Sequence, residues 1–189
     1  MTDSAAASPT VPSAAADPFP PQTIEAFLRC CAGEWMSLRS QFRLGISGDE
    51  EAEAWHSSER GELLVHYLDA SPAGNPGPGP AGGPGGIQVI PKLDGTLQAG
   101  RTLLFAADGQ FSSEASGGTG AAAEQGRWTL WPDGSLELVV ATATGELREK
   151  IWFTKANLRL RSTVETRSDG TPGQASFSSE IRRVSRPAS

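Results

Sequence analysis

Residues 157–165, NLRLRSTVE, constrain the fold most, because apolar and polar side chains alternate at its centre. Successive side chains of an extended chain point to opposite faces, so a period of two predicts a β-strand. Leu158 and Leu160 then share one face, and Arg159 and Arg161 share the other. Either the leucines lie in the core and the arginines in water, or the arginines face inward and hold an anionic ligand. The strand alone favours the first alternative, because arginine is rarely buried without a partner.

Similar strand patterns follow one another along the chain, with short turns between them. GRWTLW and SLELVVATA flank the turn tripeptide Pro132-Asp133-Gly134, while EAWHSSER and ELLVHYLD read as two strands joined at Gly61. We expect about nine or ten strands and no alternation of strands with helices. The pattern predicts an all-β fold of antiparallel strands, either an up-and-down barrel or a sandwich. A closed barrel of this size has room inside for one small ligand.

One short amphipathic helix is predicted before the strands. The apolar residues of IEAFLRCC, from Ile24 to Cys31, recur at helical spacing. Thr23 precedes them as a candidate N-cap, and Ala32-Gly33 as a candidate stop.

The composition divides the chain into one domain and three outlying segments. Residues 1–21 contain mostly Ala, Ser and Pro, which predicts a disordered tail. The domain spans residues 22–184, and residues 185–189 form a short second tail. Within the domain, the Pro/Gly tract at 71–86 is expected to be a flexible surface insertion outside the strand ladders.

The charge of the chain limits its partners. A formal net charge of −6 argues against nucleic acid and against an anionic membrane surface. An anionic ligand would therefore need a local cluster of arginines. No apolar run approaches the roughly 18 residues of a membrane-spanning helix. No basic residue precedes Arg29, so we expect a cytosolic protein without a targeting signal.

The few potential metal ligands do not form a site pattern. Cys30 and Cys31 are neighbours in the sequence, a spacing that disfavours a disulfide between them. Together with His56 and His66 they lack the spacing of a zinc site, so we predict no metal. We expect the two cysteines to be packing residues of the helix.

Four segments together resemble the S/U-type phycobiliprotein chromophore lyases, a family of bilin lyases. These segments are GEWMSLRS (33–40), GRWTLWPDGSLEL (126–138), EKIWFTKANLRLRST (149–163) and ASFSSEIRR (175–183). The resemblance implies a lipocalin-like (calycin-like) antiparallel barrel with an N-terminal helix. It also implies an enzyme that binds an open-chain tetrapyrrole, phycocyanobilin or phycoerythrobilin, as substrate and needs no cofactor. Such an enzyme attaches the bilin by a thioether bond to a cysteine of an apo-phycobiliprotein in the cytosol of a cyanobacterium or a relative.

The resemblance also assigns roles to five residues. Arg39, Arg159 and Arg161 fall on the arginines of the family pattern, and Ser162 on the small polar residue after them. These four would bind the bilin, since the planar guanidinium matches the propionates of a bilin. Glu149 falls on the acidic pocket residue and would be catalytic, as a hydrogen-bond acceptor for pyrrole N–H groups or as a proton donor.

One departure from the family pattern keeps other functions open. Residues 40–43, SQFR, stand where the family often has a pair of histidines. A bilin carrier that does not catalyse attachment is therefore an alternative to a lyase. A third possibility is one subunit of a heteromeric lyase, and a homodimer is suggested by the resemblance alone.

Overall fold

The computed structural model describes residues 18–43, 55–70, 83–115 and 123–184. Helix α1 spans Ile24–Cys31 and is followed by eleven strands. The strands are β1 (Gly33–Arg43), β2 (Trp55–Leu68), β3 (Gly85–Leu93), β4 (Thr96–Leu97), β5 (Arg101–Phe105), β6 (Gln110–Ala115), β7 (Glu124–Leu130), β8 (Leu136–Thr142), β9 (Gly145–Lys155), β10 (Leu158–Arg167) and β11 (Pro172–Arg182).

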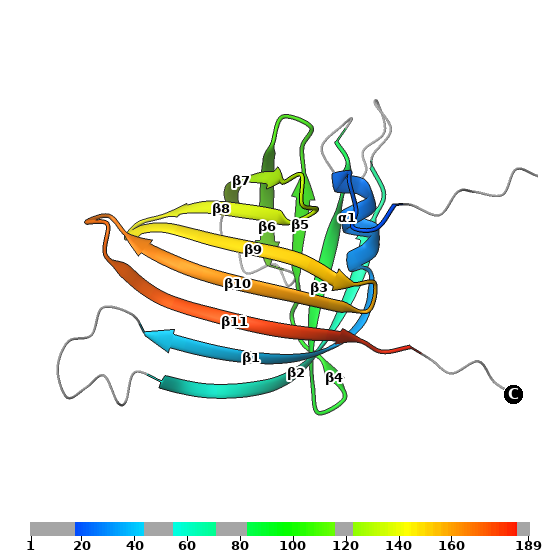
Figure 1. The fold of residues 1–189 in the computed structure, drawn as a ribbon, viewed down its shortest axis with the longest axis horizontal. Helices are drawn as coiled ribbons and strands as arrows, with labels where there is room; N and C mark the ends of the chain where they lie inside the picture. Colours follow the sequence, from blue (N-terminus) through cyan, green and yellow to red (C-terminus); the bar gives the residue numbers. More distant parts are fainter. Residues whose placement is uncertain (1–17, 44–54, 71–82, 116–122, 185–189) are drawn as a thin grey trace, which may run out of the picture.

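The strands form one antiparallel sheet that closes on itself (Figure 1). Their order is β2-β1-β11-β10-β9-β8-β7-β6-β5-β3, and β2 also pairs with β3. β4 is a two-residue addition at the edge of β3. The closed ring therefore contains ten strands, which confirms the all-β barrel and decides between the barrel and the sandwich.

Strand β2 differs from the prediction of two strands joined at Gly61. It runs without a break from Trp55 to Leu68, and Gly61 pairs with Ser37 of β1. A Cβ added at Gly61 would meet no atom within 4 Å, so this glycine is not required by a turn or by close packing. The glycine suggested a break because it usually weakens a strand, but the ladder with β1 continues through it here.

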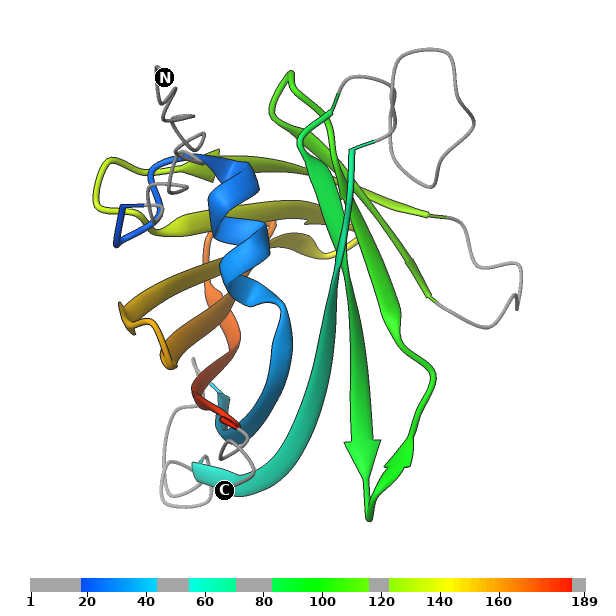
Figure 2. The ribbon, with the colours of Figure 1, turned by 90° about the vertical axis from the view of Figure 1, so that its right-hand side faces the viewer.

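The N-terminal helix forms as predicted and packs against β2 and β3, near one end of the barrel (Figure 2). The hydroxyl of Thr23 accepts a hydrogen bond from the amide of Ala26 at 3.2 Å, which caps the helix. The buried face of α1 contributes Phe27, Leu28 and Cys31 to the apolar core. Among the described residues, no helix has the length and apolar character needed to cross a membrane.

The structured region begins earlier than predicted and includes the end of the Pro/Gly tract. Phe19 makes an edge contact with Phe153, and Pro21 is fully buried, although both lie in the predicted tail. Residues 1–17, 71–82 and 185–189 lie outside the described residues. Gly85 and Gly86 belong to β3 and pair with β5, so the expectation that the tract 71–86 joins no ladder is wrong at its last residues. At Gly86 the carbonyl oxygen of Leu103 lies 2.4 Å from where a Cβ would be, so the close approach requires glycine.

The side chains of NLRLRSTVE point the opposite way from the first alternative, in which the leucines lie in the core and the arginines in water. Arg159 is buried at 1% exposure, whereas Leu158 and Leu160 lie on the other face of β10 and are partly exposed. β10 thus presents its arginines to the barrel interior and its leucines to the outside. The fold leaves a row of inward charges that needs partners inside the barrel.

Candidate functional site

The inward charges lie on a polar wall formed by β9, β10, β11 and β1, which run side by side in Figure 1. The strand register places them in successive rows across the wall. One row joins Ser37, Glu180, Arg159 and Phe153, and the next row joins Arg39, Ser178, Arg161 and Ile151. A third row joins Gln41, Ser176, Thr163 and Glu149.

The Arg159–Glu180 pair forms the deepest part of the wall. Nε of Arg159 donates to Oε2 of Glu180 at 2.5 Å, and the two side chains are only 1% and 2% exposed. The guanidinium also lies over the ring of Trp35, 4.5 Å from its centroid. Two charges this deep are tolerable only because each satisfies the other. In this arrangement the side chain of Arg159 is too buried to contact a ligand.

Arg161 lies one row closer to solvent, between two carboxylates. Its Nη1 donates to Oε1 of Glu149 at 2.9 Å, and its Nε lies 3.5 Å from Oε1 of Glu180. Arg161 and Glu149 are each 22% exposed. Burial lowers the pKa of Arg161, but the two carboxylates outweigh it and hold the pKa above its ordinary value. Arg161 is therefore a permanent cation that a ligand entering the barrel can reach.

Arg39 occupies the same row as Arg161, with Ser178 of β11 between them. Its Nη2 donates to the hydroxyl of Ser176 at 3.3 Å, and the residue is exposed. Two strand spacings of about 4.8 Å separate the backbones of Arg39 and Arg161. The small side chain of Ser178 lies between the two arginines in this row.

Ser162, the fifth residue of the predicted site, is not brought together with the other four. It lies between Arg161 and Thr163 on β10, so its side chain alternates to the outer face. There it pairs with Phe177 of β11 and Lys150 of β9. The structure thus gathers Arg39, Glu149, Arg159 and Arg161 inside the barrel and leaves Ser162 outside.

The end of α1 closes the apolar side of this wall. Arg182 lies over the ring of Trp35 at 4.3 Å and donates to the carbonyl oxygens of Cys30, at 2.6 Å, and Ala32. The buried thiol of Cys31 lies near Arg159; burial raises its pKa more than that arginine lowers it. Cys31 is therefore a protonated packing residue with a free thiol.

Comparison with known proteins identifies the family of this chain. The family model described as CpeS-like protein matches residues 108–183. Over 173 residues the chain is 44% identical to "Chromophore lyase CpcS/CpeS 1" of Paulinella chromatophora, covering 89% of this chain and 92% of the relative. The chain belongs to the CpcS/CpeS family of chromophore lyases.

Two more distant similarities are consistent with that membership. A chromophore lyase CpcS/CpeS of Thermosynechococcus vestitus is 42% identical over 64 residues, covering 33% of this chain and 35% of the relative. The solved structure of the S-type phycobiliprotein lyase CPES from Guillardia theta superposes with a TM-score of 0.53 at 18% identity. That superposition covers 87% of this chain and 95% of the Guillardia chain, and it supports the barrel fold.

The sequence pattern did not reveal the surroundings of Glu180 in this chromophore lyase. The structure pairs Glu180 with buried Arg159 and with Arg161. A signal was present in ASFSSEIR, where Ser176, Ser178 and Glu180 alternate with Ala175, Phe177, Ser179 and Ile181, three of which are apolar. That alternation marks a polar inward face, which complements the inward arginines of β10.

The described part of the lyase offers no cluster of three or more His, Cys, Asp or Glu side chains suited to a metal ion. The charged groups of the wall are instead arginines paired with carboxylates. Arginine side chains are suited to bind carboxylates, and carboxylates accept hydrogen bonds from N–H donors.

Proposed function

We propose that this chromophore lyase binds an open-chain tetrapyrrole along the polar wall and attaches it to a cysteine of an apo-phycobiliprotein. The observation that carries the proposal is Arg161, a partly exposed cation held inside the barrel between Glu149 and Glu180. The names of the relatives, chromophore lyase and phycobiliprotein lyase, support the same reaction.

The two propionates of the bilin would take Arg161 and Arg39. Both arginines lie in one row of the wall and both are accessible, in contrast to Arg159. Each guanidinium can donate two parallel hydrogen bonds to a carboxylate. Arg159 would then act indirectly. Its ion pair positions Glu180, and Glu180 in turn positions Arg161.

Glu149 would act on the pyrrole system. While Arg161 is its partner, Glu149 is a carboxylate that can accept hydrogen bonds from pyrrole N–H groups. Glu149 is also within reach of a ligand held at Arg161, where it would exchange a proton with the bilin as a general acid or base.

The bond-forming step would be the addition of a thiol across the ethylidene double bond of ring A. The acceptor thiolate forms the C–S bond, and the electron pair of the double bond moves into the conjugated system. A proton delivered to the bilin completes the addition, so the thiol hydrogen is balanced and no oxidant or reductant is needed. The acceptor supplies the nucleophile, since Cys31 of the lyase is buried and protonated.

The proposal includes phycocyanobilin or phycoerythrobilin as substrate, with no metal and no further cofactor. It places the reaction in the cytosol, because the free, buried thiol of Cys31 suits a reducing compartment. The partners are thus a linear tetrapyrrole and an apo-phycobiliprotein subunit, and neither nucleic acid nor a membrane takes part.

An attachment assay tests the proposal. The purified chain is mixed with each bilin and an apo-phycobiliprotein subunit, and covalent bilin fluorescence is followed on a denaturing gel. We expect faster formation of a single adduct than in a mixture without the lyase. A shifted bilin spectrum without accelerated attachment would identify a carrier or one subunit of a heteromeric lyase. No shift and no acceleration would contradict bilin binding at the polar wall.

A further inference from the structure

Trp35 of β1 joins the end of helix α1 to the polar wall. Its side chain is fully buried, and the register places it beside Arg182, one inward row from Glu180 and Arg159. The indole N–H donates a hydrogen bond to the carbonyl oxygen of Cys31 at 2.9 Å. Because Cys31 is the last residue of α1, the helix restrains the rotation of the indole ring.

Two guanidinium groups lie over the ring of Trp35. The central carbon of Arg159 is 4.5 Å from the ring centroid, and that of Arg182 is 4.3 Å from it. Arg182 is itself held at the helix end, where it donates to the carbonyl oxygens of Cys30 and Ala32. A cation over a tryptophan face is attracted by the ring, and more strongly where water is excluded. Trp35 thus gives the buried Arg159 a fixed aromatic surface to pack against.

The contacts of Arg159 with Glu180 leave the orientation of its guanidinium open. Both Nε and Nη2 of Arg159 lie 2.5 Å from the same oxygen, Oε2 of Glu180. A guanidinium that meets a single oxygen can tilt about it, whereas two parallel hydrogen bonds to two oxygens would fix its plane. Packing on an aromatic face restrains the same plane. The ring of Trp35 therefore supplies a restraint that Glu180 alone does not.

The second oxygen of Glu180 carries this restraint to Arg161, since Oε1 of Glu180 lies 3.5 Å from Nε of Arg161. We infer that Trp35 is a positioning residue for bilin binding. It holds the guanidinium of Arg161 in place for a propionate, acting through the Arg159–Glu180 pair. This role rests on the proposed function, in which Arg161 binds a propionate. Trp35 itself is too buried to contact the bilin.

A measurement of carboxylate recognition separates this role from ordinary packing. Trp35 also packs against Phe153 in the core, at 6.1 Å between ring centroids, so a large change at Trp35 destabilises the barrel. A loosened barrel would weaken the binding of every bilin alike, whereas a displaced Arg161 weakens only a bilin with charged propionates. The quantity to measure is the dissociation constant of phycocyanobilin dimethyl ester divided by that of phycocyanobilin. We call this ratio the carboxylate preference.

Absorbance titrations with the two bilins give this ratio for the full chain and its variants, at a temperature below their melting transitions. We expect a carboxylate preference of about tenfold or more in the wild type, since a charge-assisted hydrogen bond contributes to affinity on that scale. Trp35→Leu should lower it to about threefold or less, because the ring over which Arg159 lies is lost. Trp35→Phe keeps an aromatic face and should retain most of the preference.

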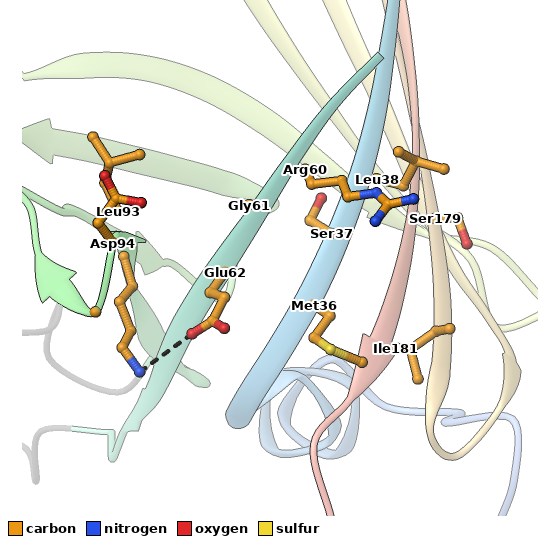
Figure 3. Close-up of a pocket in the computed structure, with 12 residues that line it drawn as sticks. Met36, Ser37, Leu38, Arg60, Gly61, Glu62, Leu93, Asp94, Ser179 and Ile181 are labelled. Atoms are coloured by element: carbon orange, nitrogen blue, oxygen red, sulfur yellow. Dashed lines mark ion pairs between the residues drawn. The ribbon is translucent and has the colours of Figure 1, made fainter.

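Two control variants change the surroundings of Trp35 but leave its ring in place. Phe27 is also fully buried, 5.3 Å from Phe153, and among the described residues no arginine lies over its ring. Met36 follows Trp35 on β1 but faces outward, into a groove of about 610 Å³ lined by β1, β2 and the turn after β3 (Figure 3). Phe27→Leu and Met36→Ala should both keep the wild-type carboxylate preference.

Arg182→Met is a second test variant for the case that Trp35→Leu does not fold. Arg182 is only partly buried, so its loss should leave the barrel folded. The substitution removes one cation from the ring of Trp35 and releases the carbonyl oxygens of Cys30 and Ala32. Trp35 then loses part of its support, and we expect the carboxylate preference to fall about twofold or more. Circular dichroism melts show which variants are folded.

The outcomes distinguish the positioning role from the proposed function. A wild-type preference that persists in Trp35→Leu, or in Arg182→Met where Trp35→Leu does not fold, would overturn the positioning role and leave the proposed function standing. A fall in Phe27→Leu as large as that in Trp35→Leu would also overturn it, because general loosening of the core would then be the cause. A wild type without a carboxylate preference would contradict the propionate contacts of the proposed function, and the positioning role with them.

Discussion

Nη1 of Arg161 and Oε1 of Glu149 lie 2.9 Å apart on neighbouring strands inside the barrel, and both side chains remain 22% exposed. The pair is thus neither a surface ion pair nor a buried one. A second carboxylate, Glu180, lies 3.5 Å from Arg161 and is itself held by Arg159. Opposite charges therefore alternate from the buried Arg159 to the accessible Glu149.

The first prediction concerns Arg159 and Glu180. Arg159→Met leaves the carboxylate of Glu180 buried without its main partner, and we expect a loss of about 3–5 kcal/mol in the free energy of unfolding. The double variant Arg159→Met, Glu180→Met removes both charges and should recover most of that loss. Urea unfolding measures all variants. If the unfolding free-energy costs of the two single substitutions simply add in the double variant, Arg159 and Glu180 are not a coupled pair.

The second prediction concerns the shape of the guanidinium of Arg161. Arg161→Lys keeps the positive charge but loses the planar pair of donors, so bilin binding should weaken about tenfold. Arg148→Lys is the control, because Arg148 lies on the outer face of β9 and pairs with Glu137 and Glu146. Absorbance titration with phycocyanobilin measures both variants. Equal affinities would mean that the bilin does not use Arg161 as a carboxylate clamp.

The third prediction concerns the packing of the barrel wall. A Cβ at Gly126 would lie 2.4 Å from Cε1 of Phe111 and 2.6 Å from the carbonyl oxygen of Val139. We expect Gly126→Ala to cost about 1–3 kcal/mol in the free energy of unfolding. Gly61→Ala, where the added Cβ meets nothing within 4 Å, is the matched control and should be neutral or slightly stabilising. Similar thermal melting of the two variants would refute the close packing at Gly126.

The fourth prediction concerns pH. Burial raises the pKa of Cys31 in the folded chain above its value in the unfolded chain, so the unfolded chain loses this proton first as the pH rises. Stability from this group is complete below the unfolded pKa and is lost as the pH rises above it, by at most about 1.4 kcal/mol per pH unit. Urea unfolding between neutral and alkaline pH should show a shallower decline for Cys31→Ala than for Cys30→Ala. Identical slopes would contradict a protonated Cys31.

The strand pattern of the sequence was informative about the fold, because period-two alternation is a local property. NLRLRSTVE predicted β10, and the turn at Pro132-Asp133-Gly134 forms as expected, with Asp133 accepting from both the amide and hydroxyl of Ser135. Alternation alone does not say which face is buried. That choice depends on Glu180, which lies 21 residues after Arg159 and supplies the counter-charge inside the barrel.

The other differences between prediction and structure also arise because a local pattern does not contain long-range contacts. The end of the Pro/Gly tract enters β3 because β2 and β5 provide ladders on both sides, which no local pattern contains. Ser162 was assigned to the site by its place in a motif, yet its neighbours on both sides face inward and it faces out. Residues adjacent in the sequence of a strand lie on opposite faces, so a strand motif joins two surfaces with separate roles.

Glu149, inside the barrel, is expected to take part in attaching the bilin. The most direct measurement compares Glu149→Gln with Glu146→Gln, an outward residue of the same strand that pairs with Arg148, in bilin binding and in the rate of attachment. We predict that Glu149→Gln still binds bilin but attaches it about 10²–10⁴-fold more slowly, while Glu146→Gln matches the wild type. Equal attachment rates for all three proteins would contradict the catalytic role of Glu149.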